Sequence, residues 1–222
     1  MTFASGEAEG VDADIVRAIA ALECLKPDIR EVAQAAVIPS VQTKRTDLAA
    51  GVWYRTVERA KIVSQSAPLY LDSPALVSKD GVSKPADLIG RKVGTVQGNL
   101  WVDELNGLLG GKLKLYQSWD QLWQDLLNGR IDVAVGAFAQ AQQSIAKENA
   151  EIKVVKAEAD PRITSTTRPG QTNLPHTKGN DALTKALDED IAELHASGKI
   201  AEILQSHGID PAVAETGEPY LL

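Results

Sequence analysis

The spacing of apolar residues changes repeatedly along the chain, and these changes predict helices that alternate with short buried strands. From Asp12 to Leu25 and from Asp181 to His195, apolar side chains recur every three or four residues, which is the spacing of one helix face. Short apolar runs at Lys92–Val96 and Ile131–Val135 predict buried strands. Strands that alternate with helices predict an α/β fold with mostly parallel strands.

The same criteria predict the remaining elements of the fold. Further helices or helical turns are expected at 36–43, 55–61, 85–88, 100–109, 119–128 and 199–206, with Gly129 as a helix stop. Further strands are expected at 29–32, 47–52, 75–78, 114–116 and 152–155. Residues 1–10 are expected to be a loop, and residues 160–180 a loop with strand fragments.

A ten-residue pattern occurs twice, 85 positions apart, at Lys44–Trp53 and Gly129–Phe138. Both copies read Arg-x-Asp, a short apolar run, Gly and an aromatic residue, and each copy follows an amphipathic stretch. A helix–turn–strand unit that is built twice predicts two similar lobes with a cleft, and clefts are favoured places for small-molecule sites. The alternative is chance similarity between two ordinary helix–strand units, because short apolar motifs recur easily.

Composition and charge exclude several classes of protein. The chain has 222 residues, of which 44% are hydrophobic, enough for one large domain or two small ones. The net charge of −7 and the scattered basic residues disfavour nucleic acid and anionic membranes as partners. The apolar runs are far shorter than a membrane span.

Cysteine and histidine point to no redox or metal chemistry. Cys24 is the only cysteine, so it forms no internal disulfide, and we expect it to be buried. His176, His195 and His207 lack the spacing of metal ligands, so we expect neither a metal nor a cofactor. The first residues lack the basic region and apolar core of a signal peptide, and a mature chain would have the same appearance.

Arg59 is the first candidate for a ligand contact. It lies one short turn beyond the expected strand at 47–52, where the carboxyl end of a strand meets the start of a helix, with Thr56 as the N-cap. Its guanidinium group matches a carboxylate with two parallel hydrogen bonds. A surface arginine paired with Glu58 or another nearby acid is the alternative.

Two further groups of residues follow the expected strands. Gln97, Gly98 and Asn99 form a strand-to-helix turn in which Gly98 lets a ligand approach the backbone and Asn99 caps the helix. A plain capping turn is the alternative, since the Lys-Ser/Thr of a phosphate-binding loop is absent. Trp53, Tyr54 and Phe138 follow the repeat strands and would wall a pocket, or pack in the core below the loops.

Seven motifs in order resemble those of the bacterial extracytoplasmic solute-binding proteins of the amino-acid-binding family, the receptors of ABC importers. The motifs are Gly10–Ile15, Val37–Val41, Arg55–Ala60, Ser66–Tyr70, Asp87–Gly94 with Gln97-Gly98, Asn128–Asp132 and Ser197–Lys199. The similarity runs nearly from end to end of the chain.

The resemblance implies a type II periplasmic-binding-protein fold, in which two α/β lobes joined by two hinge strands close around a ligand. Lobe 1 is expected at 1–72 and 173–222 and lobe 2 at 73–172, with hinge crossings near 71–74 and 171–174. Arg59 falls on the family's position for the ligand carboxylate. The expected ligand-binding residues are Arg59, Trp53, Tyr54, Gln34, Phe3, Gln97, Gly98, Asn99, Ala137 and Phe138.

The sequence departs from the family at several positions. Ala137 stands where amino-acid receptors carry an Asp for the ligand's ammonium group, and Leu100 and Val52 stand where small or hydroxyl residues are common. Because an unpaired buried ammonium is costly, these departures favour a small organic anion, or an amino-acid-like ligand held by Gln34, Tyr54 and Asn99. Family members have a strand and loop before the position of Phe3, so the first lobe is expected to lack its N-terminal strand.

The resemblance implies a receptor that captures a small carboxylate-bearing solute, outside the cytoplasmic membrane or in the periplasm, for a membrane ABC permease. A homo-oligomer is expected if another copy of the chain supplies the missing strand. Two alternatives remain: a dehydratase-like enzyme acting on a prephenate-like carboxylate, and an extracytoplasmic sensor domain. No general acid stands out for the enzyme, and the lack of a membrane-spanning segment disfavours the sensor.

Overall fold

The computed structural model describes residues 2–4, 7–146 and 151–222, and they form two compact units. Unit 1 comprises residues 1–32, 36–72 and 170–222, and unit 2 comprises residues 33–35 and 73–169. The chain therefore leaves unit 1 after Asp72 and returns to it at Gly170.

Unit 1 is built from helices and very short strands. Its elements are β1 (Thr2–Ala4), β2 (Glu7–Glu9), α1 (Val11–Leu22), α2 (Gln34–Gln42), β3 (Trp53–Tyr54), α3 (Val57–Ala60), β4 (Ser64–Gln65), β5 (Leu71–Asp72), β11 (Gly170–Asn173), β12 (Pro175–His176), α7 (Asp181–Ala196), α8 (Lys199–Ser206) and the 3₁₀ turn η4 (Pro211–Ala214). The first two residues of α2 cluster with unit 2. A three-stranded sheet has the order β3-β11-β5, and β4 pairs with β12.

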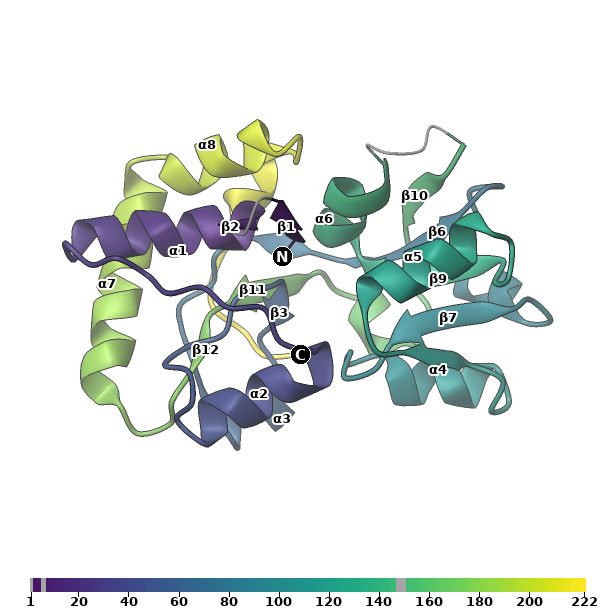
Figure 1. Ribbon diagram of the computed structural model, residues 1–222, viewed down its shortest axis with the longest axis horizontal. Helices are drawn as coiled ribbons and strands as arrows, with labels where there is room; N and C mark the ends of the chain where they lie inside the picture. The colour runs from purple at the N-terminus through teal and green to yellow at the C-terminus, as the bar shows by residue number, and fades with distance from the viewer. Residues whose placement is uncertain (1, 5–6, 147–150) are drawn as a thin grey trace. The chain divides into compact units, whose positions relative to one another are not determined.

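The helices of unit 1 have N-terminal residues that stabilise a helix start, and three of them pack together. Asn180 caps α7 by accepting a hydrogen bond from the Leu183 N–H, and Asp12 and Asp14 lie in the first turn of α1, where the helix dipole favours acids. The three helices α1, α7 and α8 pack against one another (Figure 1). Ile15 and Ile19 of α1 and Leu187, Ile191 and Leu194 of α7 are buried, as their spacing predicts, whereas Leu22 at the end of α1 is 39% exposed.

Unit 2 has a mixed five-stranded sheet of order β10-β6-β9-β7-β8. Its elements are β6 (Pro74–Ser78), η1 (Pro85–Leu88), β7 (Val93–Val96), α4 (Val102–Leu108), β8 (Lys114–Tyr116), α5 (Trp119–Leu127), β9 (Val133–Ala137), α6 (Phe138–Ala141), the π-helical turn η2 (Gln142–Ala146), β10 (Lys153–Lys156) and η3 (Thr164–Thr166). The strands β7, β8 and β9 are parallel, whereas β6 is antiparallel to both β9 and β10.

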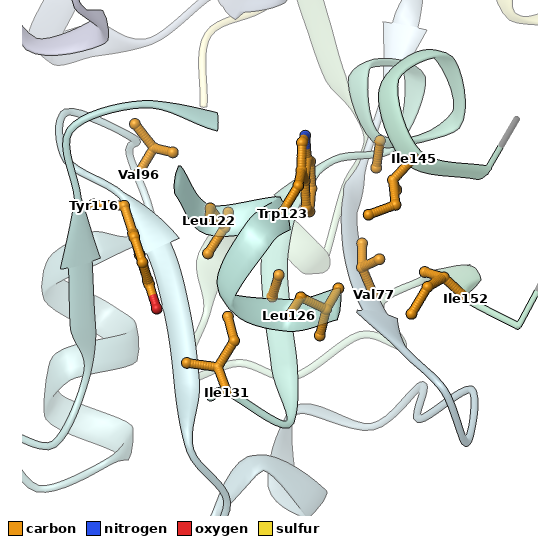
Figure 2. Packing of buried hydrophobic residues seen from close by; sticks show 11 residues of the cluster. Val77, Val96, Tyr116, Leu122, Trp123, Leu126, Ile131, Ile145 and Ile152 are labelled. Atoms are coloured by element: carbon orange, nitrogen blue, oxygen red, sulfur yellow. The ribbon is translucent and has the colours of Figure 1, made fainter. Parts of the chain in front are cut away.

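The core of unit 2 gathers around α5. Ser118 caps this helix, and Leu122, Trp123 and Leu126 project from its buried face. Figure 2 shows these side chains packed with Val77, Val96, Tyr116, Ile131, Ile145 and Ile152. Trp119 stacks on Trp123 with 5.7 Å between ring centroids and packs against the same cluster.

The repeated pattern has a common geometry at its helix end. The Arg45 N–H donates to Ser40 O at 2.9 Å, and at the matching position the Arg130 N–H donates to Asp125 O at 2.8 Å. Lys44 and Gly129, which also match, both adopt the left-handed conformation, with φ of 58° and 68°. The predicted helix and turn are therefore present in both copies.

The strand part of the pattern differs between the copies. β9 follows in the second copy, but the expected strand at 47–52 is wrong, since the structure has only an isolated bridge between Leu48 and His176 there. The positive φ values of Gly51 and Val52, 127° and 59°, bend the chain out of the extended conformation.

Three other expectations are wrong. Six of the eight described strand pairings are antiparallel, so strands are not mostly parallel. Residues 29–32 form no strand. Within 1–10, β1 and β2 pair antiparallel where a loop was expected. Among the described residues, no helix combines the length and apolar character needed to cross a bilayer.

Candidate functional site

Arg59 is held in unit 1 by the short helix α3 and by the strand before it. Thr56 caps α3 as predicted, its Oγ1 accepting a hydrogen bond of 3.1 Å from the Arg59 N–H. The guanidinium group donates to the carbonyl oxygen of Tyr54 at 2.7 Å and lies 4.6 Å from the centroid of the Trp53 ring. Glu58 pairs instead with Lys61 at 2.6 Å, so the alternative of a pair between Arg59 and Glu58 is wrong.

The charge of Arg59 is poorly compensated. Burial lowers the pKa of Arg59 to about 10, and the nearby Tyr54 only partly offsets this effect. Within the described part of the chain Arg59 takes part in no ion pair. A partly buried cation without a counter-ion gains free energy when a carboxylate binds beside it.

The two aromatic residues of β3, Trp53 and Tyr54, contact the Arg59 guanidinium group and are themselves held by neighbouring residues. Trp53 is buried and packs with Val41, Ala49 and Val63, so its ring is part of the core of unit 1. The Tyr54 hydroxyl donates to Asp72 Oδ2 at 2.6 Å, and burial followed by the charge of Asp72 raises the pKa of Tyr54 well above its usual value.

Asp12 is a structural residue of this region that sequence reasoning missed. Its carboxylate is 4% exposed and accepts hydrogen bonds of 2.6 Å from Gly51 N–H, Val52 N–H and the Tyr70 hydroxyl. It therefore holds the bent segment that leads into Trp53. Asp12 lies in the motif Gly10–Ile15, but an acid in the first turn of a helix is already explained by the helix dipole, so the sequence gives no sign of its contacts with distant residues.

In unit 2 the remaining candidate residues follow parallel strands of one sheet. Gln97 and Asn99 come directly after β7, and Gln97 Oε1 accepts a hydrogen bond of 3.1 Å from Gln117, which follows β8. Asn99 Nδ2 donates to Val96 O at 3.0 Å, and α4 begins later, with Trp101 as its N-cap. The prediction that Asn99 caps this helix is therefore wrong.

Gly98 has a positive φ that residues with a side chain rarely adopt, and there is little space for a side chain at this position. Its φ is +91°, and a Cβ atom at this position would lie 3.2 Å from Ala35 Cα, which clusters with unit 2. Gln34, beside Ala35, is partly buried at the start of α2. The backbones of Gln34 and Gly98 therefore lie near each other.

Ala137 and Phe138 lie at the carboxyl end of β9. Ala137 is buried at the last position of the strand, and the Phe138 N–H donates to Ser73 O at 2.9 Å. The Phe138 ring is partly exposed, with the Lys156 ammonium nitrogen 4.9 Å from its centroid. Since β7 and β9 are parallel neighbours, Phe138 and Gln97 lie at the same edge of the sheet.

The candidates therefore form one group in each unit. Arg59, Trp53 and Tyr54 are together in unit 1, and Gln97, Gly98, Asn99, Ala137 and Phe138 share one sheet edge in unit 2. The prediction for Phe3 rests on a side chain outside the described residues.

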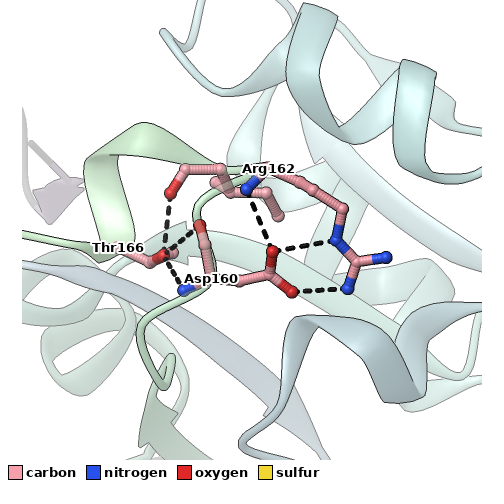
Figure 3. A network of polar contacts seen from close by, with 4 residues as sticks. Asp160, Arg162 and Thr166 are labelled. Carbon is pink, nitrogen blue, oxygen red and sulfur yellow. Dashed lines mark hydrogen bonds and ion pairs between the residues drawn. The ribbon is translucent and has the colours of Figure 1, made fainter.

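A separate polar network in unit 2 serves the structure rather than ligand chemistry. Asp160 accepts hydrogen bonds from Arg162 Nε at 2.9 Å and from Arg162 N–H at 3.0 Å, and its own N–H donates to Thr166 Oγ1 at 2.8 Å (Figure 3). The Arg162 guanidinium lowers the pKa of Asp160 to about 2. The carboxylate, the N–H group and the carbonyl oxygen of Asp160 all form hydrogen bonds with residues of the same loop.

Other reactive side chains offer no site. Cys24 is exposed, so the prediction that it is buried is wrong. His176 is buried between Leu174 O and Thr184 Oγ1, and His195 contacts Pro68 O. Within the described ranges, no cluster of three or more His, Cys, Asp or Glu residues could hold a metal ion.

Comparison with known families decides what kind of protein this is. The model of the bacterial extracellular solute-binding proteins, family 3, matches residues 1–209 of the chain. The chain belongs to this family.

Relatives of this solute-binding protein have related sequences and structures. It is 26% identical over 205 residues to ABC transporter arginine-binding protein 1 of Escherichia coli, which covers 90% of this chain and 82% of the relative. It is 27% identical over 200 residues to an L-cystine-binding protein of Escherichia coli, with 88% and 72% covered. An ancestral arginine-binding protein bound to glutamine matches with a TM-score of 0.80 and 26% identity, over 92% of this chain and 90% of that one.

These similarities confirm two predictions from the sequence. The family expected from the motifs is confirmed, and so is the two-lobed α/β fold class of the solute-binding proteins.

Proposed function

We propose that this solute-binding protein captures a small carboxylate-bearing solute and delivers it to a membrane ABC permease. Membership of the family supports capture of a solute, and the relatives named for arginine and L-cystine support import of small molecules of amino-acid size. The family's description as extracellular supports a location outside the cytoplasmic membrane or in the periplasm.

Arg59 carries the proposal for the carboxylate. Its guanidinium group is fixed by Tyr54 O and the Trp53 ring, is partly buried, and has no ion pair among the described residues. A ligand carboxylate would replace lost hydration with charge-assisted hydrogen bonds. In this proposal residues of unit 2 supply the remaining contacts, with Gln97, Gly98 and Asn99 in polar roles and Phe138 against the apolar body of the ligand.

The proposal extends to the character of the ligand. Ala137 offers only a methyl group at the end of β9, so an ammonium group there would lose its hydration without a carboxylate in return. The proposed solute is therefore a small organic anion with an apolar or aromatic body.

The test is isothermal titration calorimetry with benzoate, phenylacetate, hexanoate, adipate, terephthalate, L-arginine and L-glutamine. A carboxylate should bind wild-type protein, and Arg59→Ala should weaken it by about 10- to 150-fold, since hydrogen bonds to a charged group contribute about 1.5–3 kcal/mol. Lys61→Ala is the matched control: it removes an exposed charge next to the same helix and should change the affinity less than twofold. Equal affinities of wild type and Arg59→Ala, with equal melting temperatures, would overturn the role of Arg59.

A further inference from the structure

The helix α3, which carries Arg59, is too short to be stable by itself. It has only four residues, and an isolated helix of this length does not form in water. The Ala60 N–H donates to Thr56 O at 3.0 Å, which closes one helical turn. Contacts from outside α3 must therefore fix its geometry and, with it, the direction of the Arg59 side chain.

Gln65 binds both backbone groups of the residue that caps α3. The Thr56 N–H donates to Gln65 Oε1 at 3.0 Å, and Gln65 Nε2 donates to Thr56 O at 2.8 Å. A pair of residues on antiparallel strands exchanges two hydrogen bonds in the same way, and this pairing suits the extended backbone of Thr56, with φ of −138° and ψ of 152°. An N-cap requires this extended conformation, in which Thr56 Oγ1 accepts the Arg59 N–H.

Lys178 binds the other end of α3. Its ammonium nitrogen donates to Ala60 O at 3.0 Å and to Lys61 O at 2.6 Å. The last carbonyl oxygens of a helix have no partner within the helix, and a lysine side chain is one of the groups that can bind them. Gln65 and Lys178 therefore hold α3 from its two ends.

One pair of strands in unit 1 supplies both side chains. Gln65 is the second residue of β4, which pairs antiparallel with β12, and it lies opposite Pro175. Lys178 follows β12 by two residues. The Thr177 N–H donates to Asp47 O at 3.1 Å, which fixes the chain between β12 and Lys178. The β4–β12 pair is thus a frame to which both ends of α3 are attached.

The position of α3 determines where the Arg59 guanidinium group lies. From the third residue of α3 this group reaches Tyr54 O and the Trp53 ring. A guanidinium group that meets a carboxylate with two parallel hydrogen bonds has to be placed accurately, and a displacement of about 1 Å is enough to weaken such an interaction.

We propose that Gln65 and Lys178 are positioning residues for Arg59, and that they keep its guanidinium group in the geometry that binds the ligand carboxylate. This inference rests on the proposed function, in which Arg59 binds that carboxylate. Both side chains act through the backbone of α3, so neither has to touch the ligand. The affinity for an anion then depends on Gln65, a side chain without charge.

The experiment combines NMR of the Arg59 side chain with calorimetry on the carboxylates of the proposed-function test. In wild type the Trp53 ring current should shift the Arg59 side-chain protons upfield, since the guanidinium carbon lies 4.6 Å from the ring centroid. Loss of these signals in Arg59→Lys identifies them. The test variants are Gln65→Leu, Lys178→Met and Lys178→Arg. The controls Gln205→Leu and Lys185→Met make the same changes at exposed positions of α8 and α7.

Gln65→Leu should move the Arg59 signals toward those of a solvent-exposed arginine. It should weaken the best-binding carboxylate by about 3- to 10-fold, because it removes two hydrogen bonds that hold α3. In an Arg59→Ala background the same substitution should change the affinity less than twofold, since the positioned group is gone. Lys178→Met should behave like Gln65→Leu, and Lys178→Arg should keep most of the affinity because it keeps a donor. Both controls should stay within twofold of wild type.

The two measurements separate failure of this inference from failure of the proposed function. If Gln65→Leu leaves the Arg59 signals and the affinity unchanged, or weakens binding equally with and without Arg59, Gln65 does not position Arg59. Lys178 is exposed, so Lys178→Met decides the question by the same criteria if Gln65→Leu does not fold. If wild type binds none of the carboxylates, the proposed function is wrong, and the Arg59 signals of the variants still show whether Gln65 and Lys178 fix the guanidinium group.

Discussion

Replacing Asp12 by Ala should destabilise unit 1 through the segment that supports Arg59. The substitution removes the acceptor of three hydrogen bonds, those from Gly51 N–H, Val52 N–H and the Tyr70 hydroxyl. Tyr70 is 0% exposed, so its hydroxyl loses its partner without access to water. Gly51 and Val52 are only partly buried, so water can replace the carboxylate at their N–H groups.

The magnitude follows from these exposures. One fully buried unsatisfied donor costs about 1–3 kcal/mol, and two donors that regain water lose about 0.5 kcal/mol each. The expected loss in the free energy of unfolding for Asp12→Ala is therefore about 2–4 kcal/mol, a large share of the roughly 5–15 kcal/mol of a typical domain. Asp12→Asn keeps one acceptor oxygen and should cost about half as much.

Urea unfolding combined with hydrogen exchange provides the assay, since two compact units can unfold separately. Peptides covering residues 47–56 should lose protection in Asp12→Ala, whereas peptides of unit 2 should not. Asp14→Ala is the control on the same helix: its ion pairs with Arg17 and His207 are at the surface, with the carboxylate 40% exposed, and should contribute at most about 1 kcal/mol. An Asp12→Ala protein within 0.5 kcal/mol of wild type would refute the reasoning.

Two further changes probe unit 2. Leu122→Ala opens a cavity at a side chain that is 0% exposed and should lower the free energy of unfolding, measured with urea, by about 2–5 kcal/mol. The control Gln124→Ala changes an exposed residue of the same helix and should be nearly neutral. Equal losses of unfolding free energy in the two variants would contradict the assignment of Leu122 to the core. The Arg162 hydrogen bonds lower the pKa of Asp160 from 3.8 to about 2, so the stability contributed by its carboxylate is fully present above pH 4 and is lost as the pH falls through about 2. Asp160→Asn should therefore flatten the fall in melting temperature between pH 4 and pH 2, and an unchanged slope would show that Asp160 does not cause it.

The elements that sequence reasoning predicts best carry their own local signals. For α5 these are the cap at Ser118, the apolar face with Leu122 and Leu126, and the stop at Gly129. The strand β8 and the helix α8 have the predicted bounds as well. In each case the information lies within about ten residues of the element.

Unit 1 is harder to predict because distant residues determine its strands. The run at 47–52 is apolar enough for a strand, yet Asp12, 39 positions before Gly51, holds the turn that ends it. The strands β3 and β5 have only two residues each, too few for any periodicity to appear. Lys178 has no local signal either, since it lies 118 positions after Ala60, whose carbonyl oxygen it binds.

The route of the chain has a consequence for synthesis on the ribosome. All of unit 2 except residues 33–35 lies in the continuous stretch 73–169. Unit 1, in contrast, needs residues 170–222 for β11 of its β3-β11-β5 sheet and for its helices α7 and α8. β5 and β11 pair as antiparallel neighbours, with Asp72 opposite Gly170, so the inserted stretch begins and ends at adjacent points. During translation unit 2 can thus fold while unit 1 still lacks residues 170–222, the reverse of the usual N-terminal-first order.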